Sequence, residues 1–277
     1  WIISTYFHRV FYSFPFLHIK APKGSGKSQI LGVLEQLCFN AVKARPTLAS
    51  MGDIITSLRC TFLIDQAEGF YSENNYALLE ILTDSYKKDG GKRRVMEMSK
   101  GRKPLEFETY SPKAFASTID LPEDLKDRCI LIPLVRSFQT FPTPDNINEN
   151  WKEHRGNLYR LLIYSGDIHN LSVQIKNKYK GDKNLYGRVL DLWLPIETIL
   201  TFFKIDRERI EEIKKLYLFR YAQMQYEPKD YEEEVVDLLL KMFDGEEKIE
   251  ISVKKLTHEL NAQRDYKRNQ DMDFSIE

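Results

Sequence analysis

The sequence of 277 residues lacks several features that would define its class. No apolar run reaches the ~18 residues that a membrane-spanning helix needs, and no signal peptide is present. The three cysteines stand singly in apolar surroundings without a C-x-x-C pair, which argues against a disulfide framework and a zinc site. The formal net charge is zero, so any attraction to nucleic acid must be local. We therefore expect a soluble, cytoplasmic protein with no membrane partner.

The motif around which the chain is arranged is a glycine-bearing loop between a strand pattern and a helix pattern. The apolar run 16–19 leads into the loop, and helical spacing of apolar residues begins directly after it. This order is typical of a phosphate-binding loop, in which backbone N–H groups and the helix N-terminus face a polyphosphate. The predicted nucleotide-binding residues are Pro22, Lys23, Gly24, Ser25, Gly26, Lys27 and Ser28.

Within this loop, Lys27 is predicted to reach the β- and γ-phosphates of ATP, and the Ser28 hydroxyl to ligate Mg²⁺. Ala21 stands where the first glycine of the motif is expected, which is tolerable if that residue has a negative φ. The alternative is a glycine-rich turn with an incidental lysine.

A second apolar run, at 60–64, ends in Asp65 and has the pattern of a strand buried on both faces. An acid at the end of a strand adjacent to the phosphate-loop strand would hold Mg²⁺; a simple strand-end turn is the alternative. The next residue is Gln66, and the nearest carboxylate is Glu68. A glutamine can orient a water without taking its proton. We expect Gln66 or Glu68 to position the attacking water, with hydrolysis slow or dependent on Glu68.

Strand patterns at 93–98 and 105–110 predict a hairpin with a basic connection. Between Tyr86 and Pro104 lie eight basic residues and two acidic ones. Such local charge suits the phosphate backbone of DNA. The alternative is a solvated charged loop. The predicted DNA-binding residues are Lys100, Arg102 and Lys103.

Three further polar residues are candidates for the nucleotide site. Thr118 ends an apolar strand, where it could sense the γ-phosphate or be an ordinary strand-end hydroxyl. Arg128 precedes the strand pattern 129–134 and could complete the site of a neighbouring subunit, with Arg136 as a second candidate and a local ion pair as the alternative. Arg188 opens a helical segment and is predicted to fold over the nucleotide from a lid.

Strands that alternate with helices predict a three-layer α/β fold with a mostly parallel sheet over residues 1–144. Residues 145–227 read as a helical lid region. Residues 228–277 carry a helix–strand–helix pattern that fits either a winged helix or a small helical cap.

The ordered set of motifs resembles the AAA+ ATPases, and most of all the MCM-like replicative helicases of mobile genetic elements and phages. The likeness covers roughly residues 10–136. It rests on Lys23–Ser28 for Walker A, Thr61–Glu68 for Walker B, the hairpin ahead of Ala116–Thr118, and Leu121-Pro122 with Asp127-Arg128 for the arginine-finger segment. Gln66 departs from the glutamate of that family and puts the rate of hydrolysis in question.

The resemblance implies a hexameric homo-oligomer with ATP and Mg²⁺ bound between subunits and basic hairpins that grip single-stranded or forked DNA. It also implies that Arg128 is an arginine finger, that Arg188 is a second sensor, and that the C-terminal region is a winged helix. An ATP-binding initiator or clamp, which uses nucleotide as an assembly switch, is a first alternative. A monomeric small-molecule kinase with no DNA affinity is a second.

Overall fold

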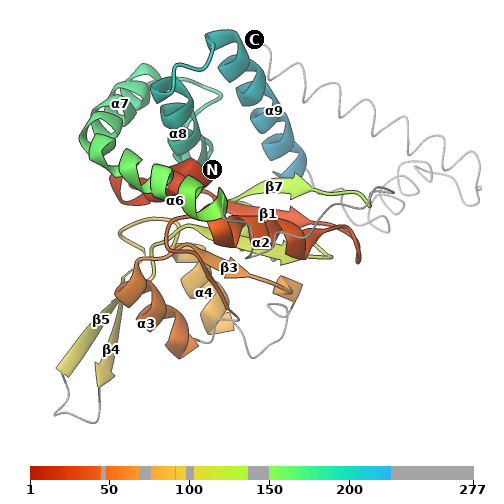
Figure 1. The fold of residues 1–277 in the computed structure, drawn as a ribbon, viewed down its shortest axis with the longest axis vertical. Coiled ribbons are helices and arrows are strands. Elements are labelled where there is room, and N and C mark those ends of the chain that lie inside the picture. The colour runs from red at the N-terminus through yellow and green to blue at the C-terminus, as the bar shows by residue number, and fades with distance from the viewer. Residues whose placement is uncertain (45–47, 69–75, 91, 98–102, 137–149, 226–277) are drawn as a thin grey trace, which may run out of the picture. The chain divides into compact units, whose positions relative to one another are not determined.

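The computed structural model describes residues 1–44, 48–68, 76–90, 92–97, 103–136 and 150–225 (Figure 1). Contacts within the chain divide it into two units, Trp1–Met224 and Gln225–Glu277. The second unit, apart from Gln225, lies outside the described residues, and so do the predicted winged helix or cap and the predicted DNA-binding residues Lys100 and Arg102. No helix in the described ranges is both long and apolar enough to cross a membrane.

The first unit is built on a five-stranded parallel sheet with the strand order β2-β3-β6-β1-β7 (Figure 1). The strands are β1 (Phe16–Lys20), β2 (Val42–Lys43), β3 (Phe62–Ile64), β6 (Lys113–Ser117) and β7 (Cys129–Pro133). This confirms the predicted α/β fold with a parallel sheet. The sequence reading missed β2, because a two-residue strand is too short to show a periodic pattern.

The expectation that the Asp65 strand is adjacent to the phosphate-loop strand is wrong. β6 lies between β1 and β3: Ile19 pairs with Ala116, and Phe115 pairs with Ile64. Because all three strands run parallel, their carboxyl ends still meet at one edge of the sheet.

Apolar side chains on both faces of this sheet explain the continuous apolar runs of its strands. On one face, Leu17 and Ile19 pack with Leu31 and Leu34 of α2 (Lys27–Leu37). On the other face, a cluster around Phe62 and Phe115 includes residues of α3 (Leu48–Leu58), α4 (Tyr76–Asp84) and α5 (Glu123–Lys126). Residues of three helices that follow β7 in the chain belong to the same cluster.

The predicted hairpin is confirmed as an antiparallel pair, β4 (Lys92–Glu97) and β5 (Lys103–Glu108), beside α3 (Figure 1). Thr56 joins the hairpin to α3: its Oγ1 accepts from the Glu108 N–H at 2.9 Å and donates to the Glu108 carbonyl at 3.3 Å. In the register, Lys92 stands opposite Glu108 and Arg94 opposite Glu106. Acidic residues thus oppose two of the basic residues on β4.

The described residues from Asn150 to Gln225 are mainly helical, and their role as a lid stays a prediction. The helices are α6 (Asn150–Arg160), η4 (Leu161–Tyr164), α7 (Ser165–Lys178), α8 (Gly187–Phe202) and α9 (Arg207–Gln225). Of these helices, α6 and α8 pack with α1 (Ile2–Tyr6), and α7 packs with η1 (His8–Val10). In this packing the aromatic rings of Tyr6, Phe7 and Phe11 join Ile168 and Ile199 in one apolar cluster.

Pro195 lies inside α8 and cannot donate the backbone hydrogen bond that the Asp191 carbonyl would otherwise accept. Ser13 supplies a replacement, because its Oγ donates to the Asp191 carbonyl at 3.2 Å. The Asp191 carboxylate in turn pairs with Lys87 at 3.0 Å. The segment before β1 therefore stabilises α8 at its proline.

The C-terminal end of α2 is capped by residues from outside the sheet. The Tyr6 hydroxyl donates to the Leu37 carbonyl at 2.9 Å, and the Arg155 guanidinium of α6 donates to the Gln36 carbonyl at 3.1 Å. These bonds satisfy carbonyls that have no partner within the helix, and the positive charge of Arg155 suits that end of the helix dipole. The helix that follows the phosphate loop is thus held at its far end by α1 and α6.

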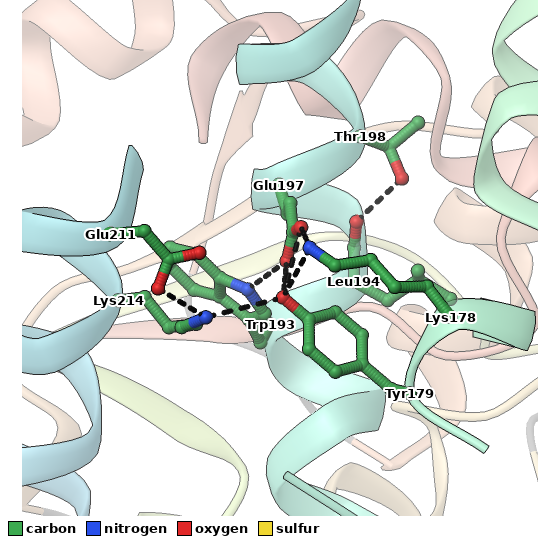
Figure 2. Close-up of polar contacts among 8 residues, drawn as sticks. All are labelled: Lys178, Tyr179, Trp193, Leu194, Glu197, Thr198, Glu211 and Lys214. Atoms are coloured by element: carbon green, nitrogen blue, oxygen red, sulfur yellow. Dashed lines mark hydrogen bonds and ion pairs between the residues drawn. The ribbon is translucent and has the colours of Figure 1, made fainter. Parts of the chain in front are cut away.

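A buried carboxylate joins α7 and α8 (Figure 2). Glu197 is 4% exposed and accepts hydrogen bonds from the Tyr179 hydroxyl at 2.8 Å and the Trp193 indole N–H at 2.5 Å. Lys178 pairs with the same carboxylate at 3.3 Å. Lys214 of α9 adds a donor to the Tyr179 hydroxyl at 3.4 Å, so three helices contribute to the cluster.

We expect Glu197→Ala to lower the free energy of unfolding by about 3 kcal/mol, because it leaves two buried donors, on Tyr179 and Trp193, without their acceptor. Urea unfolding followed by tryptophan fluorescence measures the change. Glu212→Ala, which removes an exposed ion pair with Arg209, is the control and should cost less than about 0.5 kcal/mol. Equal losses in the two variants would contradict a structural role for the buried cluster.

Candidate functional site

The loop between β1 and α2 contains two glycines in a left-handed conformation. Gly24 and Gly26 have φ values of +77° and +85°, in the left-handed region that favours glycine. The Lys27 ammonium turns back onto the loop and donates to the carbonyls of Ala21 and Pro22 at 2.5 and 2.9 Å. The Ser25 hydroxyl is buried and has no hydrogen-bond partner among the described residues. Polyphosphate oxygens fit this loop, because they would supply acceptors for Lys27 and Ser25.

Ser28 and Asp65 come together at the carboxyl edge of the sheet. The Ser28 hydroxyl donates to Asp65 Oδ2 at 3.5 Å, across the intervening β6. The other carboxylate oxygen, Oδ1, accepts from the Gln66 N–H at 3.0 Å. The described residues contain no group of three or more His, Cys, Asp or Glu that could hold a metal. One carboxylate and one hydroxyl fit Mg²⁺ delivered with ATP, since that ion takes few protein ligands and completes its shell with phosphate oxygens and water.

Glu68 and Thr118 form the second polar contact at this edge. Glu68 Oε1 accepts from the Thr118 N–H at 2.5 Å and from its hydroxyl at 2.7 Å. Burial raises the pKa of Glu68, but the bonds from Thr118 and the nearby charge of Lys27 outweigh that effect and lower it. The Thr118 hydroxyl, predicted to face the γ-phosphate, is thus engaged by Glu68 in this structure.

Gln66 occupies a different environment from Glu68. It is exposed and has a φ of +58°, in the left-handed region that residues other than glycine seldom adopt. Of the two residues predicted to position water, Glu68 is therefore the one held against the end of β6.

A buried histidine below the phosphate loop was missed in the sequence reading. His18 of β1 has no exposed surface and its Nε2 donates to Ser117 Oγ at 2.7 Å, while that hydroxyl donates to the Ile119 carbonyl at 2.6 Å. Burial lowers the pKa of His18 to about 4, so the ring is neutral near pH 7. In the sequence, His18 is hidden within an apolar strand pattern and gives no separate signal.

Arg128 lies at the opposite, amino edge of the sheet. Its carbonyl accepts from the N–H of Phe16, the first residue of β1, and its side chain is tied to the Asp124 carbonyl. The guanidinium carbon stands 5.1 Å from the centre of the Tyr86 ring, and the residue is 8% exposed. Arg136, the second candidate for an in-trans role, follows β7 and is exposed.

Arg188 lies beside Arg128 and away from the phosphate loop of its own chain. It forms an ion pair with Asp127, and its guanidinium carbon stands 5.8 Å from the centre of the same Tyr86 ring. The five residues of β1 span about 16 Å and separate this amino edge from the phosphate loop. Asp127 and Tyr86 hold the Arg188 side chain at this edge, and its role over a nucleotide stays a prediction.

Of the predicted DNA-binding residues, Lys103 begins β5, and Lys100 and Arg102 lie outside the described residues. Of the predicted nucleotide-site residues, the structure brings together Lys27, Ser28, Asp65 and, at the adjacent strand end, the Glu68–Thr118 pair. Pro22, Lys23 and Gly24 are exposed on the loop.

Comparison with known proteins gives little further information. No protein-family model matches the chain, and no curated protein matches it. Among matching solved structures is the JCV helicase, determined with a substituted acetamide bound. It is 11% identical, with a TM-score of 0.32, over 87% of this chain and 66% of the helicase chain, which is just under two thirds of its length. A likeness at this level establishes neither a family nor a function.

The contact between Thr118 and Glu68 predicts a measurable change in acidity. Thr118→Val removes the hydroxyl donor and should raise the pKa of Glu68. The pKa is measured from the pH dependence of the carboxyl ¹³C chemical shift of Glu68, which is assigned as the signal that is absent in Glu68→Gln. Thr118→Ser keeps the donor and is the control. The pKa of Glu68 is lower in the folded state than in the unfolded state. The stabilisation from Glu68 is therefore present above the pKa of the unfolded state and is lost as the pH falls through the pKa of the folded state. The stability deficit of Thr118→Val should therefore shrink in acid.

Proposed function

We propose that the chain is the ATP-hydrolysing core of a replicative DNA helicase. The observation that carries this proposal is the meeting of Ser28 and Asp65 at 3.5 Å, at the end of a parallel sheet and beside a glycine loop with Lys27. The residues that bind a nucleotide phosphate and its metal in P-loop ATPases have these chemical types and this order. The predicted basic hairpin supports DNA as the partner.

Each residue has a distinct part in the proposed reaction. Lys27 exchanges the carbonyls of Ala21 and Pro22 for phosphate oxygens, while Ser28 and Asp65 hold Mg²⁺. The bound ion would offset the negative charge of the phosphates. Glu68 orients the attacking water, because it is the carboxylate held at the end of β6, within the electrostatic influence of Lys27.

A second candidate function is an ATP-binding initiator or clamp in which nucleotide acts as an assembly switch. Two observations favour it. Gln66 has no basic group to accept a proton, and the lowered pKa of Glu68 makes that carboxylate a weaker base. Both features would slow ATP hydrolysis without weakening nucleotide binding.

The amino-edge arginines suggest how several copies would work together. Arg128 and Arg188 both contact the Tyr86 ring, and the phosphate loop of the same chain lies about one strand length from that ring. Neither arginine can reach the loop without leaving Tyr86. We propose that they serve the nucleotide of a neighbouring copy in a ring, for which a hexamer is the expected form, and that Arg136 is the exposed alternative.

ATP binding and hydrolysis provide the first test. The wild-type chain should bind ATP and hydrolyse it faster with single-stranded or forked DNA. Lys27→Ala should lose ATP binding, because the phosphates lose their cation. Glu68→Gln should bind ATP but lose about a hundredfold in turnover, the usual contribution of a positioned base. Fluorescent-nucleotide titration and phosphate release measure the two effects.

Glu35→Gln, on the exposed side of α2, is the control for this test and should match the wild type. ATP binding without DNA-stimulated turnover would favour the assembly switch. Turnover by a monomer that ignores DNA would favour a small-molecule enzyme and contradict the helicase.

DNA binding provides a second test. Replacing Lys100, Arg102 and Lys103 together with glutamine should weaken binding to single-stranded DNA and reduce the slope of log affinity against log salt by about two, since each phosphate contact contributes about 0.7. Fluorescence anisotropy across a salt series measures the slope. Glutamine at Lys176, Lys180 and Lys183, which are exposed, is the matched control. An unchanged slope in the hairpin variant would remove the hairpin from DNA binding.

A further inference from the structure

Lys43 is a residue of the candidate site that the sequence reading did not identify. Its ammonium lies 3.3 Å from Asp65 Oδ2, the same oxygen that accepts the Ser28 hydroxyl at 3.5 Å. The side chains of Lys43 and Asp65 are 32% and 28% exposed, so the ion pair is about two-thirds buried. The predicted metal ligand is thus already paired with a cation.

The backbone of β2 fixes the position of Lys43. In the pairing of β2 with β3, Lys43 stands opposite Leu63, two residues before Asp65. The N–H groups on either side, of Val42 and Ala44, donate to the carbonyls of Thr61 and Leu63 at 2.9 and 3.1 Å. The short edge strand therefore has a specific effect: it places an ammonium beside the end of β3.

The two oxygens of Asp65 are not equivalent. Oδ1 is held by the N–H of Gln66, whereas Oδ2 faces Ser28. Since Mg²⁺ would be shared by Ser28 and Asp65, Oδ2 is the oxygen available to the ion. Lys43 contacts that oxygen, and two cations drawn to one carboxylate oxygen repel each other.

We infer that Lys43 competes with Mg²⁺ for Asp65 and thereby lowers the metal affinity of the nucleotide site. This inference rests on the proposed function, because it assumes that Asp65 holds the metal of a bound nucleotide. In the absence of metal, Lys43 neutralises Asp65. When the ion arrives with nucleotide, the ammonium leaves Oδ2, and the cost of breaking this pair is subtracted from metal binding.

The coupling between metal and nucleotide tests the inference. The affinity for a fluorescent ADP analogue is measured in excess Mg²⁺ and in EDTA, and the ratio of the two affinities reports how strongly the metal supports binding. Lys43→Met should increase this ratio about threefold, the size expected for loss of a partly exposed ion pair. Lys43→Arg keeps the charge and should retain the wild-type ratio.

Lys87→Met is the matched control, because Lys87 has the same 32% side-chain exposure and pairs with Asp191 away from the loop. Its ratio should equal that of the wild type. An unchanged or smaller ratio in Lys43→Met, with nucleotide still bound and thermal unfolding still cooperative, would overturn the inference and leave the proposed function intact. If the wild-type chain binds no ADP analogue with or without Mg²⁺, the proposed function fails and the inference with it.

Discussion

The parallel register of β1, β6 and β3 is the constraint on which the candidate site depends. Ser28 and Asp65 are 37 residues apart in sequence and meet because the three strands end at the same edge. The end of β6, the strand between β1 and β3, leads to Thr118, which hydrogen-bonds Glu68 at the same edge. Because β6 lies between β1 and β3, the Glu68–Thr118 contact lies at the same edge as the Ser28–Asp65 contact.

The charged residues at the two edges of the sheet have different partners. At the carboxyl edge, Lys27, Lys43 and Glu68 all have partners within the site, so the proposed binding of a nucleotide would require an exchange of partners. At the amino edge, Arg128 and Arg188 gather on one aromatic ring, where they connect the sheet to the helices after β7.

The sequence was sufficient to predict the strand–loop–helix order around Gly24 and Gly26, the apolar strands and the hairpin, because each is specified by residues close together in the chain. It could not show that β6 separates β1 from β3, since strand order is a long-range property. The sequence also shows no sign of the ion pair Lys43–Asp65, the hydrogen-bonded pair Glu68–Thr118 or the contacts of Arg188, because polar contacts between distant segments leave no periodic signal. The same holds for Glu197, which looks like an ordinary helix-surface glutamate until Tyr179 and Trp193 are seen around it.

The proline in α8 also affects the order in which the molecule can be assembled. The hydroxyl that replaces the missing helical bond belongs to Ser13, which is 178 residues ahead of the carbonyl it serves. During synthesis the first segment leaves the ribosome long before α8 exists, and domains of this size acquire their contacts as the chain emerges. The Ser13 hydroxyl therefore lacks its acceptor, the Asp191 carbonyl, until most of the first unit has been translated. Chaperone capture during that interval would act on residues 1–15.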